Sequence, residues 1–142
     1  MKILQILPEL NLGGVEKGTI ELAKYLALNG HFSVVISNGG ALEQELHGLG
    51  IKHYKLPVHK KSLLAIFTVP KILKILEKEQ IDIVHARSRV PAIVGFLAFR
   101  KYAKRISIAQ FLNSPPAFIT TAHGYYRKHL VSKIMAKSKL II

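Results

Sequence analysis

The sequence predicts a doubly wound α/β domain with a parallel, Rossmann-like sheet. Short apolar runs alternate with segments of helical pattern along the chain, and glycines stand where strands would turn into helices. The runs are apolar at consecutive positions, as in parallel strands that helices cover on both faces. With 142 residues, 49% of them hydrophobic, the chain is long enough for one such core and too short for two. We therefore expect a single domain over residues 1–142.

The first half of the chain contains three expected strands and two expected helices. The strands are Lys2–Leu7, His31–Ser37 and Lys52–Leu56, and the helices are Val15–Asn29 and Ala41–Leu49. Each strand is a short run rich in apolar or β-branched residues, and each helix ends at a glycine, which is a common helix stop.

The second half continues the alternation. Helical pattern covers Ser62–Glu79, where Pro70 marks either a kink or the first residue of a second helix. The remaining expected elements are a strand at Asp82–His85, a helix at Val90–Tyr102, a strand at Phe118–Ala122, a helix at Ser132–Lys137 and a strand at Lys139–Ile142. Residues 103–117 show no clear pattern. We expect about six parallel strands with Asp82–His85 near the centre, because Ile83 and Val84 are apolar toward both faces.

Glycines, arginines and a histidine follow the carboxyl ends of the predicted strands. They are Gly13 and Gly14 after the first strand, Asn38–Gly40 after the second, Arg87, Ser88 and Arg89 after the fourth, and His123 and Gly124 after the fifth. In a parallel sheet these ends share one edge, where ligands bind. A glycine pair lets backbone N–H groups approach a ligand, and the following helix adds its positive dipole end. Taken together, the residues predict a site for a phosphorylated ligand.

Each of these residues also has a purely structural interpretation. The glycine pair alone is equally consistent with a tight turn, Arg87 or Arg89 with a solvated surface charge, and His123 with a helix cap. The usual nucleotide and hydrolase motifs are missing, since the chain has no G-x-G-x-x-G, no P-loop and no G-x-S-x-G, and its second strand ends without an acidic residue. The pattern therefore disfavours NAD oxidoreductases, P-loop NTPases and α/β-hydrolases.

The charge of the chain is large and unevenly distributed. The net charge is +13, and residues 83–142 carry eleven Lys or Arg and no acid. Such a surplus indicates an anionic partner, which is a phosphorylated ligand, an acidic lipid surface or nucleic acid; a general compositional bias toward lysine is the alternative. No base-stacking motif or helix-turn-helix spacing is present, so we expect no nucleic-acid partner.

Other features of the composition bear on location. The chain has no cysteine, which excludes disulfides and thiolate metal sites and fits a cytoplasmic protein. No stretch approaches the roughly 18 apolar residues that cross a bilayer, and no signal-peptide pattern precedes the first strand. We expect a cytoplasmic location, with peripheral binding at the inner face of the cytoplasmic membrane as a further hypothesis.

Several segments, taken in order, resemble family 4 glycosyltransferases of the GT-B type. They are KILQILPELNLGGVEKG at 2–18, SNGG at 37–40, LPVHKKS at 56–62, DIVHARSR at 82–89 and TTAHG at 120–124. The resemblance covers nearly the whole chain. The pair formed by DIVHARSR and TTAHG is rather specific, whereas the glycine pair alone is not.

The resemblance implies a retaining transfer of a sugar from a nucleotide-sugar donor to a lipid-linked or saccharide acceptor, as in the synthesis of cell-envelope glycans or lipopolysaccharide. It also implies two Rossmann-like domains that face each other, with no metal or other cofactor. By the same resemblance, Gly13 and Gly14 contact the donor diphosphate and His123 is the catalytic residue at the donor sugar. Arg87, Ser88, Arg89 and Gly124 would bind the acceptor or a phosphate.

The sequence departs from the family pattern by ending at Ile142. The family's C-terminal domain, which binds most of the donor, is therefore expected to be absent, and residues 1–142 correspond to the N-terminal, acceptor-side domain. We expect this domain to be incomplete as a catalyst and to need a separate donor domain as a partner. A non-catalytic relic, or a basic protein that binds anions or membrane surfaces, is the alternative.

Overall fold

The computed structural model describes residues 1–59, 63–109, 116–121 and 139–141. Within these residues the chain forms one six-stranded sheet, in which every pair of neighbouring strands is parallel. The spatial order is β3-β2-β1-β4-β5-β6. The strands are β1 (Lys2–Ile6), β2 (Phe32–Ser37), β3 (Lys52–Lys55), β4 (Ile83–Ala86), β5 (Ala117–Thr120) and β6 (Leu140–Ile141). The predicted doubly wound α/β sheet is confirmed.

The two central strands are β1 and β4, which pair with each other in the middle of the sheet. Leu4 of β1 stands opposite Val34 of β2 on one side and Val84 of β4 on the other, and all three side chains are fully buried. The central position of β4 and the burial of residues 34–36 were both expected from the sequence and are confirmed. Apolar side chains at consecutive positions allow these strands to be covered on both faces.

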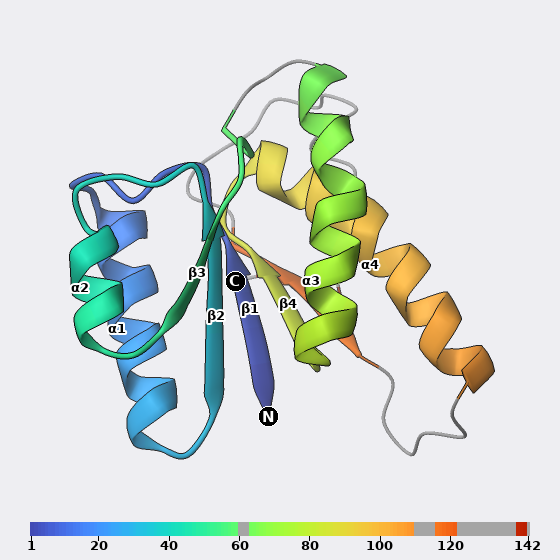
Figure 1. The fold of residues 1–142 in the computed structure, drawn as a ribbon, viewed down its shortest axis with the longest axis horizontal. Coiled ribbons are helices and arrows are strands. Elements are labelled where there is room, and N and C mark those ends of the chain that lie inside the picture. Colours follow the sequence, from blue (N-terminus) through green and yellow to red (C-terminus); the bar gives the residue numbers. More distant parts are fainter. Residues whose placement is uncertain (60–62, 110–115, 122–138, 142) are drawn as a thin grey trace.

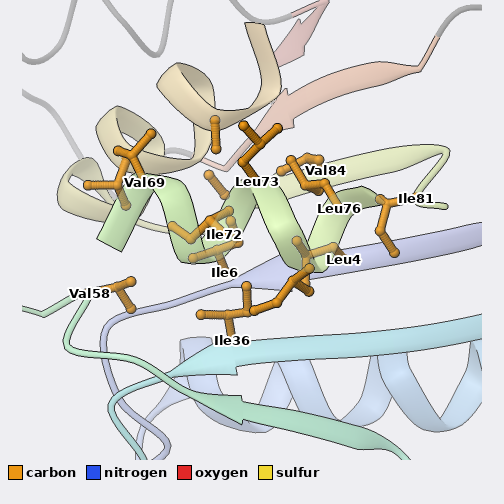
Figure 2. Close-up of a cluster of buried hydrophobic side chains, with 14 of the residues drawn as sticks. Leu4, Ile6, Ile36, Val58, Val69, Ile72, Leu73, Leu76, Ile81 and Val84 are labelled. Atoms are coloured by element: carbon orange, nitrogen blue, oxygen red, sulfur yellow. The ribbon is translucent and has the colours of Figure 1, made fainter. Parts of the chain in front are cut away.

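Helices cover both faces of the sheet (Figure 1). One face carries α1 (Gly14–Leu28) and α2 (Glu43–Gly48), and the other carries α3 (Val69–Glu79) and α4 (Arg89–Ala109). Because side chains alternate along a strand, Val35 packs with the cluster under α1 and α2, whereas Val34 and Ile36 pack with the opposite cluster. Figure 2 shows this larger cluster, in which Leu4 and Ile6 of β1 lie against α3.

A 3₁₀ helix, η1 (Leu63–Thr68), leads directly into α3. Thr68 is buried and its hydroxyl donates a hydrogen bond of 2.6 Å to the carbonyl of Ala65. Pro70 lies in the first turn of α3, where its missing N–H costs no helical hydrogen bond. Of the two roles expected for Pro70, the start of a second helix is therefore confirmed.

The helix α4 is longer than the sequence pattern indicated. It runs to Ala109, so the expected end at Tyr102 was wrong. Basic residues beyond Phe99 interrupt the apolar run, but they lie on the exposed side of the helix, while Tyr102 is buried and Ile106 packs against the core. The helix continues as an amphipathic one. The other described elements differ from their expected bounds by one or two residues, and the helix expected at Ser132–Lys137 lies outside the described residues.

Candidate functional site

The strand order places a change of direction between β1 and β4. From β1 the chain proceeds to β2 and β3 on one side, and then returns to form β4, β5 and β6 on the other side. In open parallel sheets, the carboxyl ends of two such strands form the usual ligand site, because the connections that follow them diverge. The segment between β1 and α1 begins at this point, as do Arg87 and Ser88 between β4 and α4, and the N–H of Arg87 donates a hydrogen bond of 2.9 Å to the carbonyl of Ile6.

Backbone hydrogen bonds join the loop after β1 to the loop after β2. The N–H of Asn38 donates to the carbonyl of Pro8, and the N–H of Leu10 donates to the carbonyl of Gly39, both at 2.9 Å. Gly40 has a φ of +151°, and a Cβ placed on it would lie 2.5 Å from the carbonyl carbon and oxygen of Leu10. Glycine at position 40 therefore allows the two loops to approach closely.

Gly13 and Gly14 stand at the start of α1, as the sequence predicts. Gly13 is the N-cap residue with extended backbone, and it makes no side-chain cap. A Cβ on Gly13 would meet the carboxylate of Glu16, whereas a Cβ on Gly14 would have no atom of the described chain within 4 Å. The first turn of α1 thus has open space beside Gly14, with the backbone N–H groups and the positive helix end that favour an anion.

Arg87 is half-buried between β1 and α1. Its Nη1 donates hydrogen bonds to Oε1 of Gln5 at 2.9 Å and to the hydroxyl of Thr19 at 3.0 Å. Gly18 leaves room for the guanidinium, since a Cβ there would lie 3.6 Å from Nη2 of Arg87. Burial lowers the pKa of Arg87, and the nearby carboxylate of Glu16 opposes that shift. The guanidinium therefore fixes the N-terminal half of α1 to the sheet.

The hydrogen bonds around Arg87 extend into β1 and α1. Gln5 is fully buried, and its amide Nε2 donates to the carbonyl of Thr19 at 3.1 Å. The hydroxyl of Thr19 donates in turn to the carbonyl of Val15 at 2.8 Å. Hydrogen bonds among Gln5, Thr19 and Arg87 thus attach α1, which carries the glycine pair, to the sheet. The sequence analysis did not predict this role for Gln5, because it lies within an apolar strand.

A second polar network, also missed in the sequence, lies beneath the loop after β2. The Ser37 hydroxyl lies 2.8 Å from Nε2 of His53 and accepts a hydrogen bond of 2.9 Å from the N–H of Gly39. On the other side of the ring, Nδ1 of His53 lies 3.5 Å from Oε2 of Glu43. The second oxygen of Glu43 accepts the N–H of Gly40 at 2.8 Å and the Lys55 ammonium at 3.2 Å.

Two pKa values in this network are displaced. Burial lowers the pKa of His53, whose side chain is 2% exposed, although the carboxylate of Glu43 partly opposes the effect. The hydrogen bond from the N–H of Gly40 lowers the pKa of Glu43. The signal in the sequence was weak, because Ser37, Glu43 and His53 are spread over two strands and a helix.

Ser88 and Arg89 mark the start of α4. The carbonyl of Ser88 accepts the N–H of Ala92 at 2.8 Å, and Arg89 is the first helical residue, with an exposed side chain. Nearby, Nε2 of the buried His85 lies 2.6 Å from the hydroxyl of Thr121, just after β5. This contact fixes the point at which the chain leaves β5. His123 and Gly124 lie outside the described residues.

Two kinds of feature are missing from the described part of the chain. No three His, Cys, Asp or Glu side chains there are grouped so that they could hold a metal ion. In the same residues, no helix combines the length and the apolar character needed to cross a membrane.

Comparisons with known proteins point to a single family. Residues 12–142 match the family described as Glycosyltransferase Family 4. Among curated proteins, a capsular polysaccharide biosynthesis glycosyltransferase, CapH of Staphylococcus aureus, is 34% identical over 89 residues, which are 61% of this chain and 23% of CapH.

Solved structures agree with this match. A glycosyltransferase from Rickettsia africae superposes with a TM-score of 0.72 and 38% identity, over 93% of this chain and 32% of that protein. Two more distant structures show the same fold. MurG of Acinetobacter baumannii has a TM-score of 0.69 and 12% identity, over 99% of this chain and 40% of MurG. HepE of Anabaena, in complex with UDP-glucose, has a TM-score of 0.61 and 20% identity, over 87% of this chain and 29% of HepE.

These neighbours are GT-B glycosyltransferases, and the described sheet is the Rossmann-like half of that fold that the sequence predicts. The chain spans between 23% and 40% of the length of the four relatives. The family match covers nearly all of the chain, including the glycine pair, DIVHARSR and TTAHG segments. The chain belongs to glycosyltransferase family 4.

Proposed function

We propose that this chain is the acceptor-side domain of a retaining GT-B glycosyltransferase, which transfers a sugar from a nucleotide-sugar donor to a lipid-linked or saccharide acceptor. Membership of family 4 supports the reaction class, and the similarity to a capsular polysaccharide enzyme supports a role in cell-envelope glycan synthesis. The observation that carries the proposal is the glycine pair at the start of α1, with open space beside Gly14 at the carboxyl edge of the sheet.

The donor diphosphate would bind at this helix start. Backbone N–H groups of the first turn of α1 donate to its oxygens, and the open space beside Gly14 permits the close approach, while the space beside Gly13 holds the carboxylate of Glu16. Negative charge grows on the diphosphate as the sugar leaves, so fixed donors there stabilise the transition state more than the ground state. Arg87 adds a positive charge on the sheet side of α1, and its hydrogen bonds to Gln5 and Thr19 hold that helix in place.

The remaining residues of the proposed site serve the sugar and the acceptor. His123 is proposed to contact the donor sugar, with Gly124 beside it in the sequence, and Ser88 and Arg89 to bind the acceptor or a phosphate group of it. The exposed side chain of Arg89 at the start of α4 and the position of Ser88 after β4 support this assignment. No metal ion is included in the proposal, because fixed backbone and arginine donors supply the charge stabilisation.

The proposal also includes a donor-binding domain, on this polypeptide or on a separate one. The chain spans less than half of each of the four relatives, which supports assigning most of the donor-binding residues to a part of the enzyme outside residues 1–142. A transfer reaction needs both substrates oriented at once, and half of the site cannot supply that. We therefore assign donor and acceptor recognition to the assembled enzyme.

We further propose a cytoplasmic enzyme that associates with the inner face of the cytoplasmic membrane. A net charge of +13 favours binding to anionic lipid, and such a location would bring the enzyme to lipid-linked acceptors. The same charge supports the second candidate function, a non-catalytic protein that binds anions or membrane surfaces. The two candidates differ in whether nucleotide binding depends on the glycine pair.

The test is a titration of the 142-residue chain with UDP, observed by NMR through the backbone amides of α1. We expect weak binding whose largest shifts lie at residues 13–16, with inorganic phosphate binding more weakly and EDTA making no difference. Gly14→Val should abolish the UDP shifts by filling the open space. Gly48→Val is the matched control, because a Cβ on Gly48, at the end of α2, also meets no atom of the described chain within 4 Å. Equal UDP binding by wild type and Gly14→Val would contradict the proposed donor site.

A further inference from the structure

Two large apolar side chains project from the 3₁₀ helix η1. Phe67 is 74% exposed and Ile66 is 46% exposed, whereas Ala65 and Thr68 on either side of them are buried. A single exposed apolar residue is ordinary, but two adjacent ones on a short helix expose apolar surface that water solvates poorly. Their exposure therefore calls for a partner.

The 3₁₀ helix that carries these two side chains is packed against the core. Ala65 belongs to the larger core cluster together with Val69 at the start of α3, and the hydroxyl of Thr68 is bonded to the carbonyl of Ala65. η1 packs against both α3 and α4. Ile66 and Phe67 are thus carried by a turn that is itself packed against the core, and they project from it where a partner surface can contact them.

η1 lies at the same end of the sheet as the candidate site. Figure 1 shows it as the first green turns, at the end of the molecule where α1 and α4 begin and the loops after β1 and β2 lie. This is the end reached by the carboxyl termini of the parallel strands. A surface that received Ile66 and Phe67 would therefore lie beside the edge that carries Gly14 and Arg89.

Positive charge accompanies the apolar pair. Lys71 and Lys74 are exposed on the first turns of α3, directly after η1, and Lys60 and Lys61 precede η1 in the sequence. No acidic residue occurs between Lys60 and Leu76. Ile66 and Phe67, which have only positive charges near them in the sequence, complement an anionic bilayer. The two apolar side chains would contact the acyl chains, and the lysines would contact the phosphate groups.

We infer that Ile66 and Phe67 insert into the interfacial layer of an anionic phospholipid bilayer, with Lys71 and Lys74 against the headgroups. The inference rests on the membrane association proposed above and specifies its point of contact. It also fixes an orientation, with the η1 side of the carboxyl edge beside the lipid. An acceptor that is anchored in the membrane would then reach the site without leaving the bilayer.

A single-tryptophan experiment tests the insertion, because the chain contains no tryptophan. We compare Phe67→Trp with Leu28→Trp, a matched control that replaces a 77% exposed leucine at the far end of α1. On vesicles of phosphatidylglycerol and phosphatidylcholine, the fluorescence of Phe67→Trp should shift to the blue and be quenched by brominated acyl chains. The fluorescence of Leu28→Trp should show neither effect. Phosphatidylcholine vesicles alone should leave the fluorescence of both variants unchanged.

Co-sedimentation with the same vesicles measures the contribution of each group. Substituting Ile66 and Phe67 together with serine should weaken binding about tenfold, in proportion to the apolar area kept out of the lipid. Lys71→Glu with Lys74→Glu should weaken it about tenfold or more and flatten its salt dependence, whereas Lys24→Glu on the exposed face of α1 should have a much smaller effect. Circular dichroism melting curves establish that all variants are folded.

The outcomes separate this inference from the proposals on which it rests. Vesicle binding in which the indole of the Phe67→Trp variant stays in water would overturn the anchor but leave peripheral association standing. Loss of all vesicle binding would overturn both, while the UDP titration, made without lipid, would still test the donor site. Equal insertion into neutral vesicles would contradict the role of charge. Self-association of the wild type that the serine variant loses would identify a second copy of the chain as the partner instead.

Discussion

The hydroxyl of Ser37, at the end of β2, lies 2.8 Å from Nε2 of His53 in β3. The same hydroxyl accepts the N–H of Gly39, and the carboxylate of Glu43 faces the other side of the ring. The contact therefore connects an edge strand to the glycine turn after β2, and that turn is bonded to the loop leading to α1. His53 is buried within this network and holds the turn from below.

We predict that His53 makes the fold sensitive to mild acid. Burial lowers its pKa, so the unfolded chain binds more protons at this ring than the folded chain does. The stabilising contribution of neutral His53 to the free energy of unfolding should therefore be complete above the ordinary histidine pKa of about 6.5. It should decrease as the pH falls below that value. The lowered pKa of Glu43 adds a second loss at lower pH, below its ordinary value of 4.5.

The measurement is urea unfolding from pH 8 to pH 5. His53→Gln should flatten the dependence between pH 7 and pH 5. The charges of Lys55 and His47 also lower the pKa of His53, so both residues are kept in every variant. An unchanged profile in His53→Gln would show that another group controls the acid sensitivity.

A second prediction compares two arginines. Arg87→Met should lower the free energy of unfolding by about 1–3 kcal/mol, because it leaves the buried Gln5 and Thr19 side chains without a donor. Arg105→Met should cost less than about 1 kcal/mol, since Arg105 is 61% exposed in its ion pair with Glu77. Arg87→Lys should fall between, because an ammonium cannot reproduce the guanidinium geometry. Equal losses in denaturant unfolding for the two methionine variants would refute the structural role of Arg87.

A third prediction concerns the close approach of the two loops. Gly40→Ala should be destabilising by about 2 kcal/mol, because its φ of +151° and the carbonyl of Leu10 at 2.5 Å leave no place for a methyl group. Gly48→Ala, at the end of α2 with open space around it, should be neutral or stabilising by up to about 1 kcal/mol. Thermal unfolding of the two variants gives the comparison, and a neutral Gly40→Ala would show that the loops can separate at little cost.

A fourth prediction concerns catalysis. The 142-residue chain alone should show no sugar transfer, and His123→Ala should leave its melting temperature unchanged. With a donor domain supplied in trans, His123→Ala should reduce transfer at least tenfold, whereas His31→Ala should not. The assay follows release of the nucleotide from a nucleotide-sugar donor in the presence of an acceptor extract. Robust turnover by the purified chain alone would show that this domain, or a homodimer of it, holds the donor itself.

The features that the sequence predicts correctly are those set by neighbouring residues. Leu4, Val35 and Val84 sit in short runs whose apolar character shows directly that both faces of their strands are covered, and all three are fully buried. The turn at Gly14 is also a local feature. The end of α4 was misjudged, because surface lysines and arginines interrupt the apolar run without interrupting the helix. The 3₁₀ geometry of η1 has no clear local signal either.

The polar support of the site could not be predicted in the same way. Arg87 is separated from Gln5 by 82 residues and from Thr19 by 68, and nothing in the intervening sequence specifies that they meet. The sequence indicated an arginine at the edge of the sheet, and the structure places its guanidinium between β1 and α1. Ser37 and His53 likewise meet only because β2 and β3 pair in one particular register.

The long separation between Arg87 and its partners has a consequence for how the domain assembles. Residues 2–55 can pair as β1, β2 and β3 over sequence separations of about 18–30 residues, whereas Arg87 reaches Gln5 only after β4 has docked beside β1, about 80 residues along the chain. The pairing of β4 with β1 is the slower event, because chain entropy is lost in bringing the two strands together before their stabilising contacts form. The hydrogen bonds from Arg87 to Gln5 and Thr19 are therefore among the last native contacts of β1 and α1 to form.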